Sequence, residues 1–113
     1  MLPMLPPAIK RGSAELAVLS ILAEGPLHGY ELARRIEERT GGVLRFTLAS
    51  LYPLLYRLEK RGALAAEWKA APNGRSRRYY RITPRGRGQL EPLREQWRRY
   101  LEALQRLPGL ADA

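Results

Sequence analysis

The chain has 113 residues, with 20 lysines and arginines against 11 acidic residues, so its formal net charge is +9. One domain with a single modest core fits this length, the hydrophobic fraction of 45% excludes a disordered chain, and the absence of cysteine excludes a disulfide framework or a thiolate metal site. No apolar run approaches the roughly 20 residues of a membrane-spanning helix, so we expect a cytoplasmic protein whose basic charge favours a polyanionic partner, nucleic acid before an anionic membrane.

The N-terminal part of the chain predicts one buried helix after an irregular lead. Residues 1–12 contain several prolines, and we expect this lead to be loosely held. Ser13 offers an N-cap, and residues 14–24 are apolar nearly all round. Gly25 and Pro26 are expected to stop this helix.

A second helix is predicted from His28 or Gly29 to Arg39, where two glycines end it. Its apolar residues recur on one face and its charged residues on the other. The apolar connector over residues 43–46 could pair as a strand. His28 lies beside a glycine just before the helix, which is more typical of a capping or packing residue than of a catalytic base or a metal ligand.

Residues 47–62 predict a helix that begins after Thr47 as N-cap and ends at Gly62. One face has the spacing of a buried apolar stripe: Leu51, Leu54, Leu55 and Leu58. The opposite face carries hydroxyls, small groups and cations: Ala49, Tyr52, Pro53, Tyr56, Arg57 and Lys60. Such a face suits a polyanion, and a basic helix that follows another helix and a glycine-containing turn is typical of a helix-turn-helix recognition helix. If Ser50 is the N-cap instead, Pro53 falls in the first turn, where proline is tolerated.

After this helix the hydrophobic period changes to two. Residues 64–69 and 77–82 alternate on either side of a Pro-Asn-Gly turn, which predicts a β-hairpin. The second half of the hairpin and the residues after it contain arginines and no acid: Arg75, Arg77, Arg78, Arg81, Arg85 and Arg87. A basic hairpin directly after a recognition helix predicts a wing, whereas an ordinary surface hairpin would not gather its cations at this end.

A last helix is predicted to begin with Thr83 as N-cap and Pro84, and to run to about Leu107, with Gly86, Gly88 and Pro92 weakening its first turns and causing a kink or a late start. Its apolar residues repeat as a heptad seam: Leu90, Leu93, Trp97, Tyr100, Leu104 and Leu107. Because a domain of this size has little core left to cover such a seam, we expect a second copy to cover it, together with Leu101, in a two-fold dimer. The alternative is that the seam packs onto the chain's own first helix.

Several short motifs together resemble the PadR family of bacterial winged helix-turn-helix transcriptional regulators, in its smaller subgroup. The motifs are His28-Gly29-Tyr30-Glu31-Leu32, Ser50-Leu51-Tyr52-Pro53, Arg57-Leu58-Glu59 with Gly62, Glu67-Trp68, Gly74-Arg75, and Arg78-Tyr79-Tyr80-Arg81-Ile82-Thr83 with Gly86. The resemblance fits the fold predicted above, which is mainly α with a small β-hairpin: a winged helix-turn-helix domain over residues 1–83 and a C-terminal dimerisation helix over residues 84–113. It implies a homodimer that represses promoters and is released by a ligand, and we expect its operator to be palindromic.

The expected contacts with double-stranded DNA lie on the recognition helix and on the wing. In the helix the candidates for base or nearby phosphate contacts are Ser50, Arg57 and Lys60, and Tyr52 offers a hydroxyl to a phosphate. In the wing the candidates for the backbone or minor groove are Asn73, Arg75, Arg77 and Arg78. The alternative is a non-specific architectural nucleic-acid-binding protein, and a third reading is a basic protein bound to membranes.

Relatives in the smaller subgroup bind flat molecules at the dimer interface, so the resemblance implies an effector site at Trp97 and Tyr100. A planar aromatic molecule would stack between the two copies of Trp97, and Glu95 and Glu102 nearby favour a cationic one. The alternative is that Trp97 only fills the dimer core. No residue pattern typical of an enzyme occurs, so we expect no catalysis, no cofactor and no metal.

Overall fold

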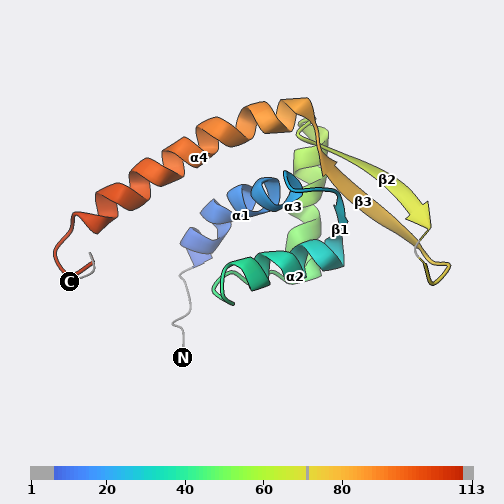
Figure 1. Ribbon diagram of the computed structural model, residues 1–113, viewed down its shortest axis with the longest axis horizontal. Coiled ribbons are helices and arrows are strands. Elements are labelled where there is room, and N and C mark those ends of the chain that lie inside the picture. Colours follow the sequence, from blue (N-terminus) through green and yellow to red (C-terminus); the bar gives the residue numbers. More distant parts are fainter. Residues whose placement is uncertain (1–6, 71, 111–113) are drawn as a thin grey trace.

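The computed structural model describes residues 7–70 and 72–110. It is mainly α-helical with a small β-hairpin, as the sequence predicts, and a further short strand completes a three-stranded antiparallel sheet. The elements in chain order are α1 (Pro7–Leu22), β1 (Leu27–His28), α2 (Gly29–Arg39), α3 (Leu48–Lys60), β2 (Leu64–Ala70), β3 (Ser76–Ile82) and α4 (Pro84–Gln105). In Figure 1 the hairpin of β2 and β3 projects to one side of the first three helices, and α4 extends to the other side.

The first helix begins earlier than predicted. Helix α1 starts at Pro7, so Ser13 is not its N-cap and the predicted loose lead is wrong for residues 7–12. Proline is favourable in the first turn of a helix, where its missing N–H is not needed, so this proline begins the helix instead of delaying it. The rest of the predicted lead, residues 1–6, lies outside the described residues.

The recognition helix α3 has Thr47 as its N-cap, as the sequence predicts. The hydroxyl oxygen of Thr47 accepts a hydrogen bond from the N–H of Ser50 at 3.1 Å, which excludes Ser50 as the cap. Pro53 therefore lies in the second turn, where it cannot donate to the carbonyl of Ala49. Ala49 is exposed, so water can reach that carbonyl. At the other end Gly62 adopts a φ of 77°, and this left-handed residue ends the helix.

The core lies where α1, α2 and α3 meet the base of the hairpin. The predicted leucine stripe of α3 is buried in this core. Helices α1 and α2 contribute apolar side chains to it as well, so that its buried residues include Val18, Leu19 and Leu22 of α1, Leu32 and Ile36 of α2, and Leu51, Leu54, Leu55 and Leu58 of α3. This packing leaves the opposite face of α3 uncovered, because the stripe turns the polar residues away from the other helices. The predicted division of the helix into a buried and an open face is confirmed.

The sheet contains one strand that the sequence does not reveal and lacks one that it suggests. Residues 27–28 form β1, which pairs with Tyr79 and Tyr80 of β3, and β3 pairs on its other edge with β2. The connector over residues 43–46 is not a strand. Both edges of β3 are occupied, and the connector instead packs Leu44 and Phe46 against the core.

Helix α4 begins at Pro84 without delay, so the predicted late start is wrong. The hydroxyl oxygen of Thr83 accepts a hydrogen bond from the N–H of Gly86 at 3.0 Å, and this hydroxyl lies 3.1 Å from the carbonyl oxygen of Ala63. Gly86 is pressed onto the same carbonyl, since a Cβ at this position would lie 2.1 Å from it. A glycine that looked like a weak helix former is therefore what allows the first turn to dock. The helix continues through Pro92 with a gradual curve (Figure 1) and ends two residues before the predicted Leu107.

The two halves of α4 have different surroundings. Leu90 is only 2% exposed and Leu93 packs against the core of its own chain. Trp97 is half-buried, and a Cβ added at Gly12 of α1 would lie 3.8 Å from its ring. Beyond this point Leu104 is half-buried, and the other large apolar side chains are more than half exposed: Tyr100, Leu101, Leu107 and Leu110. The predicted seam is thus partly used within the chain, and its remainder extends past α1 in Figure 1.

Across residues 7–70 and 72–110, none of the helices combines the length and apolar character needed to traverse a bilayer.

Candidate nucleic-acid interface

The open face of α3 presents the side chains that the sequence places there. Ser50, Tyr52, Arg57 and Lys60 are all exposed on it. The hydroxyl of Ser50 donates to the carbonyl of Thr47 at 3.0 Å, so this hydroxyl is partly engaged within the helix. The ammonium of Lys60 lies 5.3 Å above the ring of Tyr56, a cation–π arrangement that leaves the charge at the surface.

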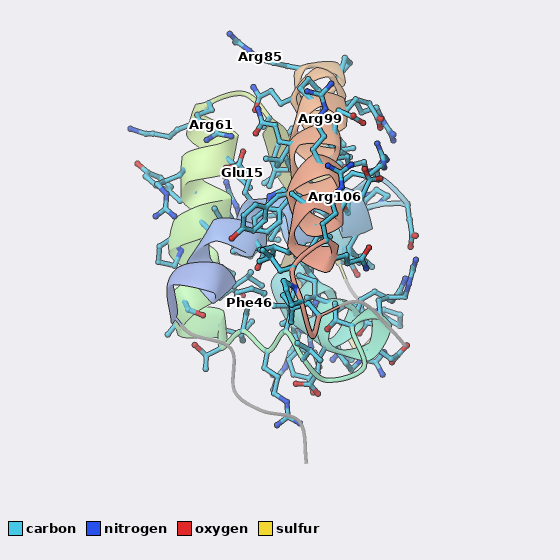
Figure 2. The ribbon with its side chains drawn as sticks, turned by 90° about the vertical axis from the view of Figure 1, so that its left-hand side faces the viewer. Glu15, Phe46, Arg61, Arg85, Arg99 and Arg106 are labelled. Atoms are coloured by element: carbon cyan, nitrogen blue, oxygen red, sulfur yellow. The ribbon has the colours of Figure 1, made fainter. Side chains whose placement is uncertain are left out.

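Arg57 differs from its basic neighbour in having no partner. Among the described residues, its guanidinium makes no ion pair and no hydrogen bond. Arg61, one turn later, is paired with Glu15 of α1 and donates to Gln89 of α4 at 3.2 Å. Figure 2 shows Arg61 and Glu15 together between α1 and α3. The guanidinium of Arg57 is therefore free on the open face of α3, whereas Arg61 ties three helices together.

The tip of the wing is a turn closed by Asn73. Its side-chain oxygen accepts a hydrogen bond from the N–H of Arg75 at 3.0 Å, and Gly74 between them has a φ of 83°. The guanidinium of Arg75 is exposed and has no partner within the described part of the chain. Asn73 thus shapes the turn that presents Arg75 to solvent.

Arg78 faces the recognition helix rather than the outside of the wing. Its guanidinium nitrogen lies 2.6 Å from a carboxylate oxygen of Glu59, and both side chains are partly buried. This hydrogen-bonded carboxylate raises the pKa of Arg78 above its ordinary value. The guanidinium also lies 5.9 Å from the ring of Tyr80. The structure therefore gives this predicted contact residue a partner in α3, which fixes the wing relative to the helix.

A groove runs between the inner face of the wing, the start of α2 and the first turns of α3. Its volume is about 520 Å³, and its walls include Tyr30, Tyr52, Trp68 and Arg77. Sequence reasoning did not assign Tyr30 or Trp68 to the interface. A signal was available for Trp68, because it continues the strand face of Leu64 and Ala66 beyond the end of the core.

His28 caps α2, as its position suggests. Its Nδ1 accepts a hydrogen bond from the N–H of Glu31 at 3.3 Å, and its ring meets Tyr79 edge-on at 5.4 Å. Burial lowers the pKa of His28 below its ordinary value, and the nearby charge of Arg77 lowers it further. The imidazole is therefore held neutral, which is the form that can accept from the backbone.

This cap predicts a pH dependence of stability. The unfolded chain binds a proton on His28 at a higher pH than the folded chain does, so the free energy of unfolding falls as pH drops below about 6.5. Asparagine also accepts the capping bond but does not titrate. His28 is the single histidine of the chain. We therefore expect the free energy of unfolding, measured with urea, to fall less between about pH 7.5 and 5.5 in His28→Asn than in the wild-type protein. An identical pH dependence in both proteins would contradict this account.

The sequence matches the profile of the transcriptional regulator PadR-like family over residues 18–92. It is 38% identical over 97 residues to the transcriptional regulator Rv3488 of Mycobacterium tuberculosis, covering 86% of this chain and 83% of that protein. A solved transcriptional regulator from Clostridium thermocellum has a TM-score of 0.82 at 27% identity, covering 94% of this chain and 100% of the other. A PadR family regulator from Eggerthella lenta has a TM-score of 0.76 at 32% identity, covering 90% of this chain and 87% of the other. The recognition helix and the wing lie within the matched segment, whereas the exposed half of α4 lies beyond it.

Proposed function

Because this chain belongs to the PadR-like family of transcriptional regulators, we propose that it is a homodimeric repressor that binds a palindromic operator and is released from it by a small molecule. The observation that carries the proposal is the pair of unpartnered arginines at Arg57 and Arg75. One lies on the open face of α3 and the other at the tip of the wing. Two free cations on these two elements suit a helix in the major groove and a wing on the adjacent backbone.

The two arginines have different roles in this proposal. Arg57, with Ser50 and Lys60, contacts base edges or nearby phosphates, and Tyr52 donates its hydroxyl to a phosphate. Arg75 and Arg77 hold the sugar–phosphate backbone from the wing. Asn73 shapes the tip, and Arg78 acts through Glu59 by fixing the angle between wing and helix.

The proposal predicts distinct effects for Arg57→Ala and Arg75→Ala. The test uses a DNA fragment selected from a random pool by the protein itself and an unselected duplex of equal length. Loss of a base contact at Arg57 should weaken binding to the selected fragment by ~1–3 kcal/mol and affect the unselected duplex much less. Loss of a phosphate contact at Arg75 should weaken both and reduce the slope of affinity against salt by ~1.

Equal losses on both DNAs for Arg57→Ala would make Arg57 a phosphate contact only. If, in addition, the wild-type protein prefers no fragment from the pool, the chain is the non-specific architectural protein considered above. An unchanged salt slope for Arg75→Ala would remove the wing tip from the interface.

The exposed half of α4 supports the dimer. We propose that residues 84–113 form the dimerisation arm beside a DNA-binding domain over residues 1–83, although the first turns of α4 are also part of the core. The arm's free apolar surface comes from Tyr100, Leu101 and Leu107, and Trp97 and Leu104 on the same helix are half-buried. Leu90 and Leu93 contribute by fixing the helix on the body, because their own side chains face the chain's core.

We propose Trp97 and Tyr100 as the effector site. Their rings meet edge-on at 5.9 Å, and Tyr100 is exposed, so a planar aromatic molecule has a surface on which to stack. Glu95 already binds Arg98 and Arg99 at 2.5 and 3.2 Å, which weakens the case for a cationic effector. In a Trp68→Phe background, planar dyes should quench Trp97 emission and weaken DNA binding by the factor by which DNA weakens dye binding. Quenching without any change in DNA affinity would make Trp97 a core residue.

A further inference from the structure

The groove beside the recognition helix gathers aromatic side chains that the core does not use. Tyr30, Tyr52 and Trp68 come from α2, α3 and β2, and they are 58%, 45% and 66% exposed. The ring of Tyr52 lies over Gly29, where a Cβ would be only 3.0 Å from the ring carbon Cε1 and from the hydroxyl. The smallest residue therefore forms the floor of the groove. Three exposed aromatic rings from separate elements therefore line one groove.

The charges around the groove favour an anionic occupant. Arg77 lines its rim, and the charge of Arg78 stands at its inner wall, partly balanced by Glu59. Among the described residues, none that lines the groove carries a carboxylate. Two tyrosine hydroxyls and a guanidinium donate hydrogen bonds to phosphate oxygens, and an indole face packs against a sugar. The combination matches one strand of a nucleic-acid backbone better than an apolar peptide.

The position of the groove agrees with that occupant. Tyr52 and Leu48 belong to the first turns of α3, on the same helix as the proposed DNA contacts Ser50 and Arg57. Trp68 stands opposite them on the wing, paired in register with Arg78. Strand β1, which precedes α2, pairs with Tyr79 and Tyr80 in the middle of β3, so the start of α2 lies beside the wing (Figure 1). If α3 lies in the major groove of DNA, the DNA strand at the edge of that major groove would reach this protein surface.

We propose that the groove holds one sugar–phosphate segment of duplex DNA, with the indole of Trp68 packed on a deoxyribose and the hydroxyls of Tyr30 and Tyr52 on the flanking phosphates. This inference rests on the proposed function, and it adds Trp68 and Tyr30 to the interface as residues that act without a charge. Because sugars and phosphates recur at every step, the contact contributes equally to all sequences. It therefore raises affinity without contributing to the choice of operator.

The test follows Trp68 directly in the full-length protein. The chain has 2 tryptophans, so labelling with 5-fluorotryptophan gives two fluorine resonances, assigned by Trp68→Phe and Trp97→Phe. The shift between H₂O and D₂O reports the exposure of each ring. We expect the Trp68 resonance to lose this shift as an unselected duplex is added at low salt. The midpoint of this loss should coincide with the midpoint of binding measured by sedimentation of the same samples. Trp97, on the arm, is the internal control and should keep its shift.

A set of variants separates a sugar contact from a phosphate contact. Trp68→Ala should weaken binding about tenfold on selected and unselected DNA alike, with no change in the salt slope. Trp68→Phe should recover part of this loss, because it keeps a ring in the groove. Arg77→Ala is the charged comparison and should reduce the salt slope by about 0.9. Since Trp68 is largely exposed, each variant should unfold at nearly the wild-type temperature.

The outcomes distinguish the groove from the function it rests on. If DNA sediments with the protein while Trp68 keeps its full H₂O–D₂O shift, the groove is empty in the complex and this inference is wrong, but DNA binding stands. If neither selected nor unselected DNA binds, the proposed function fails and the inference fails with it. A tenfold loss in Trp68→Ala that is not recovered by phenylalanine and is accompanied by early unfolding would also overturn the sugar contact.

Discussion

Replacing Gly86 by alanine is expected to destabilise the fold by about 3 kcal/mol. The added Cβ would lie 2.1 Å from the carbonyl oxygen of Ala63 and 2.8 Å from a side-chain carbon of Ile82, both far inside contact distance. The carbonyl is backbone and lies within 3.1 Å of the hydroxyl of Thr83, so it has no free direction in which to move. Helix α4 would have to lift off the body and expose Leu90, which is buried in the core. Urea unfolding of the two proteins measures the difference.

Gly88→Ala is the matched control for this substitution. Gly88 lies in the same helix with nothing within 4 Å of an added Cβ, so alanine there should only improve helix propensity, by up to ~1 kcal/mol. We therefore expect effects of opposite sign on the free energy of unfolding for two glycines that are two residues apart. If both variants gain stability, the first turn of α4 is not docked on Ala63 as described.

Replacing Leu104 by glutamate is expected to convert the proposed dimer into a monomer. Leu104 is half-buried in the exposed part of α4, between the free surfaces of Leu101 and Leu107. A carboxylate in the apolar seam between two copies would lose its water, and its burial costs several kcal/mol. Sedimentation should show the monomer mass, and affinity for the selected DNA should fall at least 100-fold, because two half-sites are no longer held together.

Gln105→Glu adds the same charge one residue later. Gln105 is exposed and lies at a position of the heptad that faces away from the seam, so its variant should remain dimeric with little loss of operator affinity. If Leu104→Glu sediments as a dimer, the arm does not form the interface. If Gln105→Glu also dissociates, the interface depends on net charge rather than on the apolar seam.

Local signals in the sequence determined the elements that carry the proposed function. Thr47 and Thr83 are N-caps because a hydroxyl accepts a backbone N–H two or three residues on, a contact that needs no distant partner. The leucine stripe of α3 and the two-residue period of the hairpin likewise repeat within one element. The recognition helix, the wing and the exposure of Arg57 and Arg75 therefore followed from residues adjacent in the chain.

The tertiary structure decided which residues remain free to act. Arg57 and Arg78 look equivalent in the sequence, yet one is open and the other is paired with Glu59, a residue 19 positions away. The same holds for the seam of α4, whose regular heptads gave no sign that Leu90 and Leu93 belong to the chain's own core while Tyr100 and Leu101 are left open. Strand β1 and the aromatic groove form only because β3 pairs with β1, a segment about 50 residues earlier in the chain. Long-range pairing assigned these partners, because a charge or an apolar face looks the same in the sequence whether or not a distant group satisfies it.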